Sequence, residues 1–276
     1  MSGTYEAPVL VVGGHGKTGR RVITRLDALG VATRPVSRTT DVPFDWSDPG
    51  TWDAALDGAA SVYLTYVPDL SFPGASDQVG ALARRIADHG IERVVLLSGR
   101  GEVGARASEE ALLASVPTAS VVQCAFFAQN FTEGAFSFDA LGGELAIPVP
   151  TEVPEPFVDL DDVADVVVAA LGDDSHAGGV LELTGPAALT FGEAWGVVGD
   201  AYGRPGAFQA ISDEEFVTAM VSVGEPAEVA YGLCALFAEV MDGRNVATTD
   251  TIARVLGRPA TSLRDAARRD VAILAR

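Results

Sequence analysis

The sequence predicts an α/β protein in which a doubly wound parallel sheet is joined to a smaller, mostly helical C-terminal domain. Between residues 8 and 124, short apolar runs rich in β-forming residues alternate with amphipathic helical segments at intervals of roughly 20–35 residues. The runs are almost continuously apolar, which is typical of parallel strands that are covered on both faces. A glycine-rich turn joins the first run to the first helix, and helical patterns dominate after residue 186.

The expected elements follow one another with short connections. Buried strands are expected over 8–12, 31–38, 59–67, 92–99, 118–124 and 180–186, with a further short strand over 144–150. Helices of the sheet domain are expected after residue 19 and over 51–56, 76–89, 107–115 and 163–171. Helices of the C-terminal part are expected over 191–202, 213–223, 227–241, 249–256 and 262–274. Residues 1–150, completed by segments within 151–185, therefore form the sheet domain, and residues 186–276 form a cap over the sheet.

Composition and charge exclude several classes of function. The 276 residues carry a formal net charge of −19, so the chain repels nucleic-acid phosphates and anionic membrane surfaces. No apolar run approaches the roughly 18 residues of a membrane span, and residues 1–6 do not resemble a secretory signal. We therefore expect a cytoplasmic protein with a small-molecule substrate and without nucleic-acid or membrane partners. A homodimer is left open by the sequence.

Histidine and cysteine form no pattern that predicts a metal site. His15, His89 and His176 are scattered along the chain. Cys124 has no histidine close to it in sequence, so packing is a better explanation for it than a catalytic thiol. The aspartates within 159–162 stand at the start of a helix, where carboxylates cap the helix and favour its dipole. The sequence therefore predicts no metal.

The glycine-rich turn over residues 13–19 predicts a phosphate site. Gly13, Gly16 and Gly19 follow a buried strand and lead into a helix, whose free N–H groups and dipole favour an anion. The spacing is not the usual G-x-G-x-x-G, although Gly14 adds a further position without a Cβ. An ordinary strand-to-helix turn is the alternative. We expect the whole loop to hold a dinucleotide, including three residues between the glycines: His15, Lys17 and Thr18.

The end of the second strand indicates which dinucleotide is bound. A site that prefers NAD places an acidic residue there to hold the ribose 2′-hydroxyl. No acidic residue lies between Ala28 and Thr40, where Ser37 and Arg38 stand instead. A guanidinium and hydroxyl groups suit a 2′-phosphate, so we expect NADP(H). A solvated loop arginine is the alternative.

Other candidate residues follow the ends of later strands. In a doubly wound sheet, ligands bind at the carboxyl ends of the strands. Residues 13–19, Arg38, Asp45, Trp46, Ser98 and the four residues 65–68 (Thr65, Tyr66, Val67 and Pro68) are therefore expected to converge on one crevice. Aromatic residues cluster in the sequence after the fifth strand, and either a substrate pocket or core packing explains them: Phe126, Phe127, Phe131 and Phe157.

Several motifs together resemble the NmrA-like branch of the atypical short-chain dehydrogenases. The resemblance rests on 13–19, 44–48, 95–99, 126–131, 159–164, 183–194 and 249–259, and so covers nearly the whole chain. It is carried by the order and spacing of these motifs, since none is decisive alone. Within that branch the chain looks most like the bacterial relatives of the ergot-alkaloid reductases, which reduce an iminium with NADPH.

The resemblance implies a Rossmann domain for NADP(H) with a small substrate domain. It also implies roles for individual residues: the glycine loop would hold phosphates and Arg38 the 2′-phosphate. Asp45 and Trp46 would lie by the adenine, and residues 65–68 would lie along the nicotinamide half. Asn130 matches an asparagine that lines the pocket in this branch.

The chain departs from the usual Ser-Tyr-Lys chemistry of short-chain dehydrogenases. Its only lysine is Lys17, so no Y-x-x-x-K motif exists, and the helix expected at 106–115 has no tyrosine. Ser98 keeps its place at a strand end. The proton of a reduction is therefore expected from Tyr66, Ser98 or water.

Three functions remain compatible with this departure. The first is NADPH-dependent reduction of a small apolar, cyclic electrophile of secondary metabolism, such as an iminium, an enone or a quinone, which needs little acid help. The second is a regulator that binds NADP(H) without turnover. The third is a non-redox enzyme on the same fold. The sequence favours the first.

Overall fold

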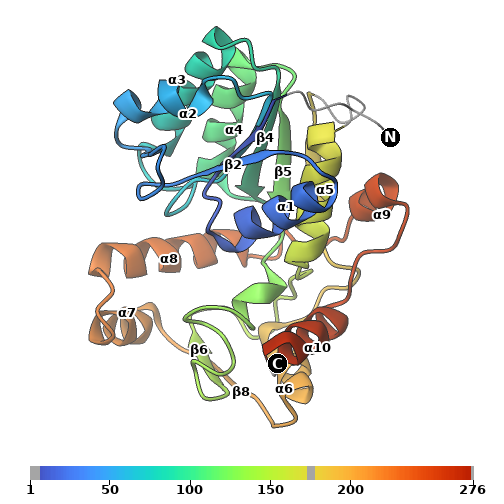
Figure 1. Ribbon diagram of the computed structural model, residues 1–276. Coiled ribbons are helices and arrows are strands. Elements are labelled where there is room, and N and C mark those ends of the chain that lie inside the picture. The colour runs from blue at the N-terminus through green and yellow to red at the C-terminus, as the bar shows by residue number, and fades with distance from the viewer. Residues whose placement is uncertain (1–6, 173–177, 275–276) are drawn as a thin grey trace.

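The computed structural model describes residues 7–172 and 178–274. A six-stranded parallel sheet has the strand order β2-β1-β3-β4-β5-β7 (Figure 1), which confirms the predicted α/β fold. Its strands are β1 (Val9–Val12), β2 (Thr33–Val36), β3 (Ser61–Leu64), β4 (Arg93–Gly99), β5 (Ser120–Cys124) and β7 (Val180–Leu183). The chain reverses direction across the sheet between β1 and β3, which is the switch point where ligands bind in such folds.

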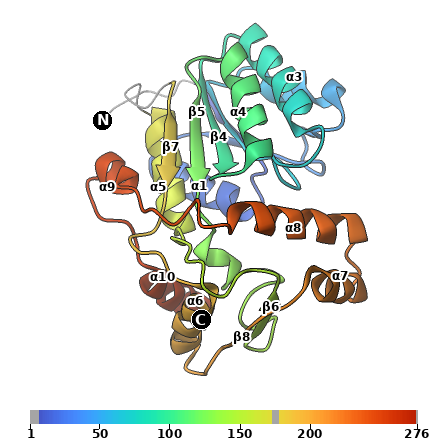
Figure 2. The ribbon, with the colours of Figure 1, turned by 180° about the vertical axis from the view of Figure 1, so that it is seen from behind.

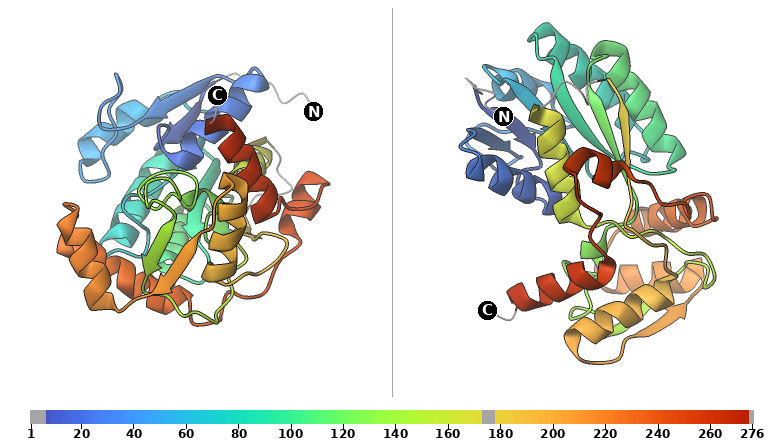
Figure 3. Two further views of the ribbon diagram at one scale, coloured as in Figure 1. Left: turned by 90° about the horizontal axis from the view of Figure 1, so that it is seen from below. Right: turned by 90° about the vertical axis from the view of Figure 1, so that its right-hand side faces the viewer.

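Helices cover both faces of this sheet. One face carries α1 (Lys17–Ala28) and α5 (Leu160–Gly172), and the other carries α2 (Trp52–Leu56), α3 (Ala75–Asp88) and α4 (Val103–Ser115). Figure 2 and the right view of Figure 3 show the sheet between these two layers. Val9 and Val11 pack toward the first layer, and Leu10 and Val12 toward the second. Strands buried on both sides have no polar face, and this explains the continuous apolar runs.

A second unit lies beyond the carboxyl ends of the strands (Figures 1 and 3). It contains the 3₁₀ turn η2 (Ala128–Asn130), β6 (Glu144–Ile147), α6 (Phe191–Tyr202), β8 (Ala207–Ala210), α7 (Asp213–Ser222), α8 (Ala227–Val240) and α10 (Leu263–Leu274). Its core includes many aromatic rings, among them Phe131, Phe138, Phe157 and Trp195. This core draws on residues 128–157 as well as 191–267, whereas α9 (Thr251–Leu256) packs beside α5 on the sheet domain.

Two details differ from the sequence-based expectations. Strand β8 was not expected, because its four residues pair only with the equally short β6 and carry no long apolar run. Helix α4 begins at Val103 instead of residue 107, although Gly104 is a poor helix former. A Cβ on Gly104 would lie 2.7 Å from the backbone of Ser71, so this glycine allows the first turn of α4 to approach that loop. The earlier start makes Glu102 the N-cap residue of α4.

Within the described ranges, no helix is both long enough and apolar enough to cross a membrane.

The short 3₁₀ turn η1 (Pro49–Thr51) precedes α2, and the Asp48 carboxylate accepts a hydrogen bond from the amide of Gly50 at its start. Residues 1–6 and the turn that holds His176 lie outside the described residues.

Candidate functional site

The glycine loop is built so tightly that side chains would not fit. Gly13 has a φ of +76°, and a Cβ there would lie 2.1 Å from Oγ1 of Thr65. A Cβ on Gly19 would lie 2.3 Å from the carbonyl oxygen of Gly13, which means that α1 packs directly on the loop. Gly16 is the N-cap residue of α1, so no side chain occupies the first amides of the helix. Such an arrangement of glycines before a helix N-terminus can accept a phosphate group.

The end of β2 presents polar groups to solvent. The hydroxyl of Thr40 accepts a hydrogen bond from the amide of Ser37 at 2.9 Å, which folds the loop back on the strand. Arg38 is exposed, and it forms no hydrogen bond or ion pair with any described part of the chain. Its guanidinium is therefore available to a ligand.

Asp45 and Trp46 support the neighbouring strand end. Trp46 donates a hydrogen bond from Nε1 to the carbonyl of Thr65 at 3.1 Å, and its ring lies 4.9 Å from that of Tyr66. The carbonyl of Asp45 accepts a hydrogen bond from Nε1 of Trp52 at 2.8 Å. These contacts fix the loop after β2 against the turn after β3.

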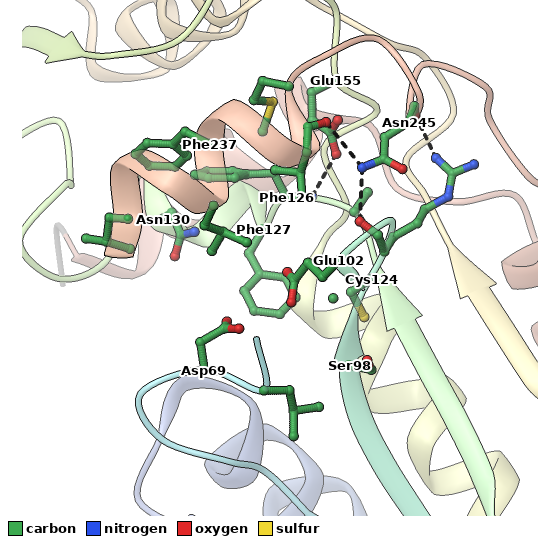
Figure 4. A pocket seen from close by; sticks show the side chains of 18 of the residues that line it. Asp69, Ser98, Glu102, Cys124, Phe126, Phe127, Asn130, Glu155, Phe237 and Asn245 are labelled. Atoms are coloured by element: carbon green, nitrogen blue, oxygen red, sulfur yellow. Dashed lines mark hydrogen bonds between the residues drawn. The ribbon is translucent and has the colours of Figure 1, made fainter. Parts of the chain in front are cut away.

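An apolar pocket of about 390 Å³ lies where the ends of β3, β4 and β5 face the second unit (Figure 4). Predicted site residues that line it are Thr65, Tyr66, Pro68, Ser98, Phe126, Phe127, Asn130 and Phe131. The opposite wall comes from α8 and the loop after it, through Leu233, Phe237, Met241 and Asn245. The pocket thus joins the two units of the molecule.

The remaining predicted site residues lie outside the lining of the pocket. They are the glycine loop, Ser37, Arg38, Asp45, Trp46, Val67 and Phe157. Phe157 is buried behind the lining, with its ring 5.8 Å from that of Phe126. Lys17, at the start of α1, donates a hydrogen bond to Oδ1 of Asn130 at 2.9 Å. This bond connects the glycine loop to the pocket wall, and burial lowers the pKa of Lys17 although the charge of Glu133 opposes that effect.

Both predicted proton donors are engaged within the protein. Tyr66 donates its hydroxyl hydrogen to Oε1 of Gln78 at 2.7 Å, and partial burial raises the pKa of Tyr66. Ser98 is buried and donates to the carboxylate of Glu109, which also accepts two hydrogen bonds from Gln123. Either hydroxyl would have to release its present acceptor before it donated to a substrate.

Sequence reasoning missed the buried acids of this pocket. Glu102 and Glu155 both line it, together with Asp69. Burial raises the pKa of Glu102 to about 9, and the charge of Asp69 adds to the effect. Burial also raises the pKa of Glu155 to about 7, while a hydrogen bond from the amide of Phe126 and the charge of Arg100 oppose the rise.

Only some of these residues could have been found from the sequence. Asp69 directly follows Pro68, and Glu102 comes three residues after Gly99, so both follow strand ends already singled out. Glu155 lies in an irregular segment that no spacing marks. Asn245 is equally unmarked, yet its Nδ2 donates to the carbonyl of Arg100 at 3.0 Å and its own carbonyl accepts from the Arg100 guanidinium.

Within the residues that the structure describes, no group of three or more His, Cys, Asp and Glu side chains could hold a metal ion. Cys124 is buried, and burial raises the pKa of its thiol. Asp159 accepts hydrogen bonds from Arg269 at 2.7 and 2.8 Å, and Asp162 accepts one from Arg258 at 2.6 Å. These aspartates are structural, as expected.

No protein-family model matches the chain. It is 29% identical to the uncharacterized oxidoreductase YesF of Bacillus subtilis, over 94% of this chain and 93% of that protein. It is 28% identical to the NAD(P)H azoreductase of Xenophilus azovorans, over 94% and 96% of the two chains. The expected likeness to ergot-alkaloid enzymes is present at 25% identity, with festuclavine synthase I of Penicillium roqueforti, over 91% and 94%.

The fold is also that of solved reductases. The triphenylmethane reductase of Citrobacter sp., crystallised with NADP(H), superposes with a TM-score of 0.77 at 17% identity, over 95% of this chain and 99% of that one. The chain is therefore similar along more than nine tenths of its length to proteins named as oxidoreductases, and it shares the fold of a reductase that binds NADP(H).

Proposed function

We propose that the chain is an NADPH-dependent reductase of NmrA-like type that acts on a small apolar, cyclic electrophile of secondary metabolism. One observation carries the proposal: a phosphate cradle at the end of β1 and an apolar pocket at the ends of β3–β5 share one edge of a single sheet. The Lys17–Asn130 hydrogen bond joins the two. In doubly wound folds, a bound dinucleotide extends from the glycine loop to the ends of the strands beyond the switch point.

The residues present fit such a cofactor. The loop over residues 13–19, including Gly14, His15, Lys17 and Thr18, would hold the pyrophosphate, because its glycines leave room that a Cβ would fill. Ser37 and the unpaired Arg38 would hold the 2′-phosphate. Asp45 and Trp46 would border the adenine. The nicotinamide half would follow Thr65, Tyr66, Val67, Pro68 and Ser98, and NADPH would supply a hydride there.

The named relatives support this assignment. An azoreductase that uses NAD(P)H and a festuclavine synthase both align with nearly the whole of this chain. The triphenylmethane reductase with the same fold was crystallised with NADP(H). In each case the second unit is part of the matched length, which supports a cap that shapes the substrate site.

The pocket favours a small substrate with aromatic or cyclic character. Phe126, Phe127 and Phe131 line it, Phe157 packs against the rings of Phe126 and Phe131, and Asn130 offers a polar group. A cavity of about 390 Å³ suits a molecule of a few rings. An iminium, an enone or a quinone of this size would be held beside the transferred hydride by shape alone.

The test is NADPH oxidation, followed at the nicotinamide absorbance band, with a panel of cyclic iminium, enone and quinone acceptors. The proposal predicts turnover with at least one class of acceptor. Tight binding of NADPH with no oxidation by any of them would favour the regulator that binds without turnover. The homodimer and the cytoplasmic location stay predictions, which light scattering and fractionation can check.

A further inference from the structure

Two half-buried carboxyl groups, those of Glu102 and Asp69, stand in the wall of the apolar pocket. Glu102 comes from the N-cap of α4, and Asp69 comes from the turn between β3 and α3. Asp69 accepts hydrogen bonds from the amide and the hydroxyl of Ser71 at 2.8 and 2.7 Å, which fix its position. Figure 4 shows the Glu102 side chain reaching into the pocket from the same wall as Cys124, with Asp69 nearby.

The end of β4 is shaped to receive the Glu102 carboxyl. A Cβ on Gly99 would lie 1.7 Å from Oε1 of Glu102, so the glycine leaves the space that the carboxyl fills. The carboxyl therefore lies over the strand end that carries Ser98. Its other oxygen, Oε2, is buried and has no hydrogen-bond partner within the described chain. A buried polar atom without a partner is costly unless a ligand or a proton compensates it.

The surroundings favour a neutral carboxyl. Asp69 faces Glu102 from the turn after β3, Glu239 from α8, and Glu109 from its own helix α4, so three acids surround it, with the Cys124 thiol on β5 beside them. The cations in the adjoining segments are engaged elsewhere, Arg100 with Glu182 and Arg244 with Asp242. Burial and these charges raise the pKa of Glu102 to about 9, so it is protonated at neutral pH.

We propose that Glu102 is the proton donor of the reduction carried out in this pocket. The inference rests on the proposed function and adds a catalytic residue to it. Glu102 differs from Tyr66 and Ser98 in one respect that matters. Those two hydroxyls already donate to Gln78 and Glu109. The Glu102 carboxyl hydrogen-bonds with Asp69, but its buried Oε2 has no partner in the described chain and is free to engage a substrate.

Reduction of a neutral acceptor such as an enone needs both a hydride and a proton. With NADPH bound, its hydride would form a C–H bond at the β carbon of the enone as the C=C π bond breaks. The electron pair of that bond takes the proton of Glu102 at the α carbon, which leaves the Glu102 carboxylate. Water that enters the pocket returns the proton to Glu102. The acceptor is reduced, the nicotinamide is oxidised, and one proton is consumed in each turnover.

A cationic acceptor does not need this proton. Hydride addition to a permanently charged iminium gives a neutral amine directly. The ratio of enone to iminium reduction therefore isolates proton donation from hydride transfer. A structural role for Glu102 would change both rates together, whereas a donor role changes their ratio.

The kinetic experiment compares Glu102→Gln with Glu110→Gln, an exposed glutamate on the same helix. Glutamine has the size of the neutral acid but no acidic proton. The proposal predicts that E102Q lowers the ratio of kcat/KM for enone over iminium by about 100-fold or more, the usual effect of a general acid, and that E110Q leaves it unchanged. An unchanged ratio in E102Q would overturn the proposal.

A second readout uses the protein without cofactor. Infrared difference spectra over a pH titration detect a protonated carboxyl directly. Wild type is expected to lose such a band near pH 9, and E102Q is expected to lack it. Asp69→Asn removes a like charge, so it should move this titration to lower pH. A spectrum of E102Q identical to that of wild type would show Glu102 ionised at neutral pH and overturn the donor role.

The two readouts separate the failure of this inference from the failure of the proposed function. If wild type oxidises NADPH with neither acceptor, the reductase assignment fails and the donor role fails with it. If wild type reduces both acceptors while the ratio in E102Q is unchanged, the reductase assignment stands and only the role of Glu102 is wrong.

Discussion

At the residue scale, the site combines an exposed basic side chain with carboxyl groups whose burial favours the neutral form. Arg38 is exposed and without a partner in the described chain, so its guanidinium is available to a ligand. Glu102 and Glu155 are buried in an apolar wall, so their neutral forms are favoured. A basic group at one end of the cleft and neutral acids at the other suit an anionic cofactor and an apolar substrate.

Arg38 is expected to select the phosphorylated cofactor. Arg38→Ala should weaken NADPH binding by roughly 1.5–3 kcal/mol, the range for a hydrogen bond to a charged group, and leave NADH binding almost unchanged. Calorimetric titration of both cofactors measures this. Arg106→Ala, at an exposed arginine on α4, is the control. Equal weakening of the two cofactors would show that Arg38 does not contact the 2′-phosphate.

Glu155 is expected to make stability depend on pH. Its pKa in the folded protein is about 7 against an ordinary value of 4.5, so the folded state binds more protons between these values. Stability therefore falls as pH rises through this window and stays lower above it, by about 3 kcal/mol. Glu155→Gln should make that fall smaller in urea unfolding by the contribution of Glu155, whereas the exposed Glu152→Gln should leave it unchanged. The same pH dependence in E155Q and wild type would refute the assignment.

At the element scale, the site depends on how strand ends and helix starts are placed. The glycine loop sets α1 directly on β1, and the early start of α4 brings Glu102 over the end of β4. The start of α5 is held by a buried ion pair. Asp159 accepts hydrogen bonds from Arg269 on α10 and from Gln129 in η2, so three segments meet at one carboxylate.

Gly19 is expected to tolerate no side chain. Gly19→Ala places a Cβ 2.3 Å from a backbone oxygen, which forces the loop and α1 apart. We expect a loss of about 1–3 kcal/mol in the free energy of unfolding, as in other overpacked sites, together with weaker cofactor binding. Gly196→Ala in α6, where a Cβ meets open space, should be neutral or stabilising. Chemical unfolding of the two variants compares them, and equal stabilities would contradict the tight loop.

The Asp159–Arg269 pair is expected to matter more than surface pairs. Asp159→Asn removes the carboxylate that accepts two hydrogen bonds from the partly buried Arg269, which then keeps only Asp161 and Asp270, and should cost about 3 kcal/mol. Arg264→Ala breaks an exposed pair with Asp200 and should cost less than about 1 kcal/mol. Urea denaturation measures both, and a similar small effect in the two variants would mean that the buried pair adds little to stability.

At the scale of the whole molecule, the pocket lies between the sheet domain and the second unit, which face each other. The sheet domain supplies strand ends, and α8 with the following loop supplies the facing wall. Arg100 and Asn245 connect the two units, because each side chain donates a hydrogen bond to the backbone carbonyl of the other residue. A pocket of this kind is apolar and sheltered, which favours hydride transfer over loss of the hydride to water.

The fold was predictable from the sequence to a greater degree than the site. Strands such as β1 and β4 are buried on both faces, so their residues must be apolar in unbroken runs. The four residues of β8 face no such requirement, and the strand was missed. The glycine loop was predictable because its backbone needs residues without a Cβ. The pKa values of Glu102 and Glu155 are raised by burial, which only the tertiary structure creates. No spacing of residues in the sequence indicates it.

The central claim is that the loop over residues 13–19 and the adjoining pocket form one site for NADPH. Calorimetric titration of the purified protein with NADPH and with NADH tests it most directly. We expect one site per chain, with NADPH bound more tightly than NADH. Absence of binding by either cofactor would contradict it, because the cradle that the glycines form would then hold no dinucleotide.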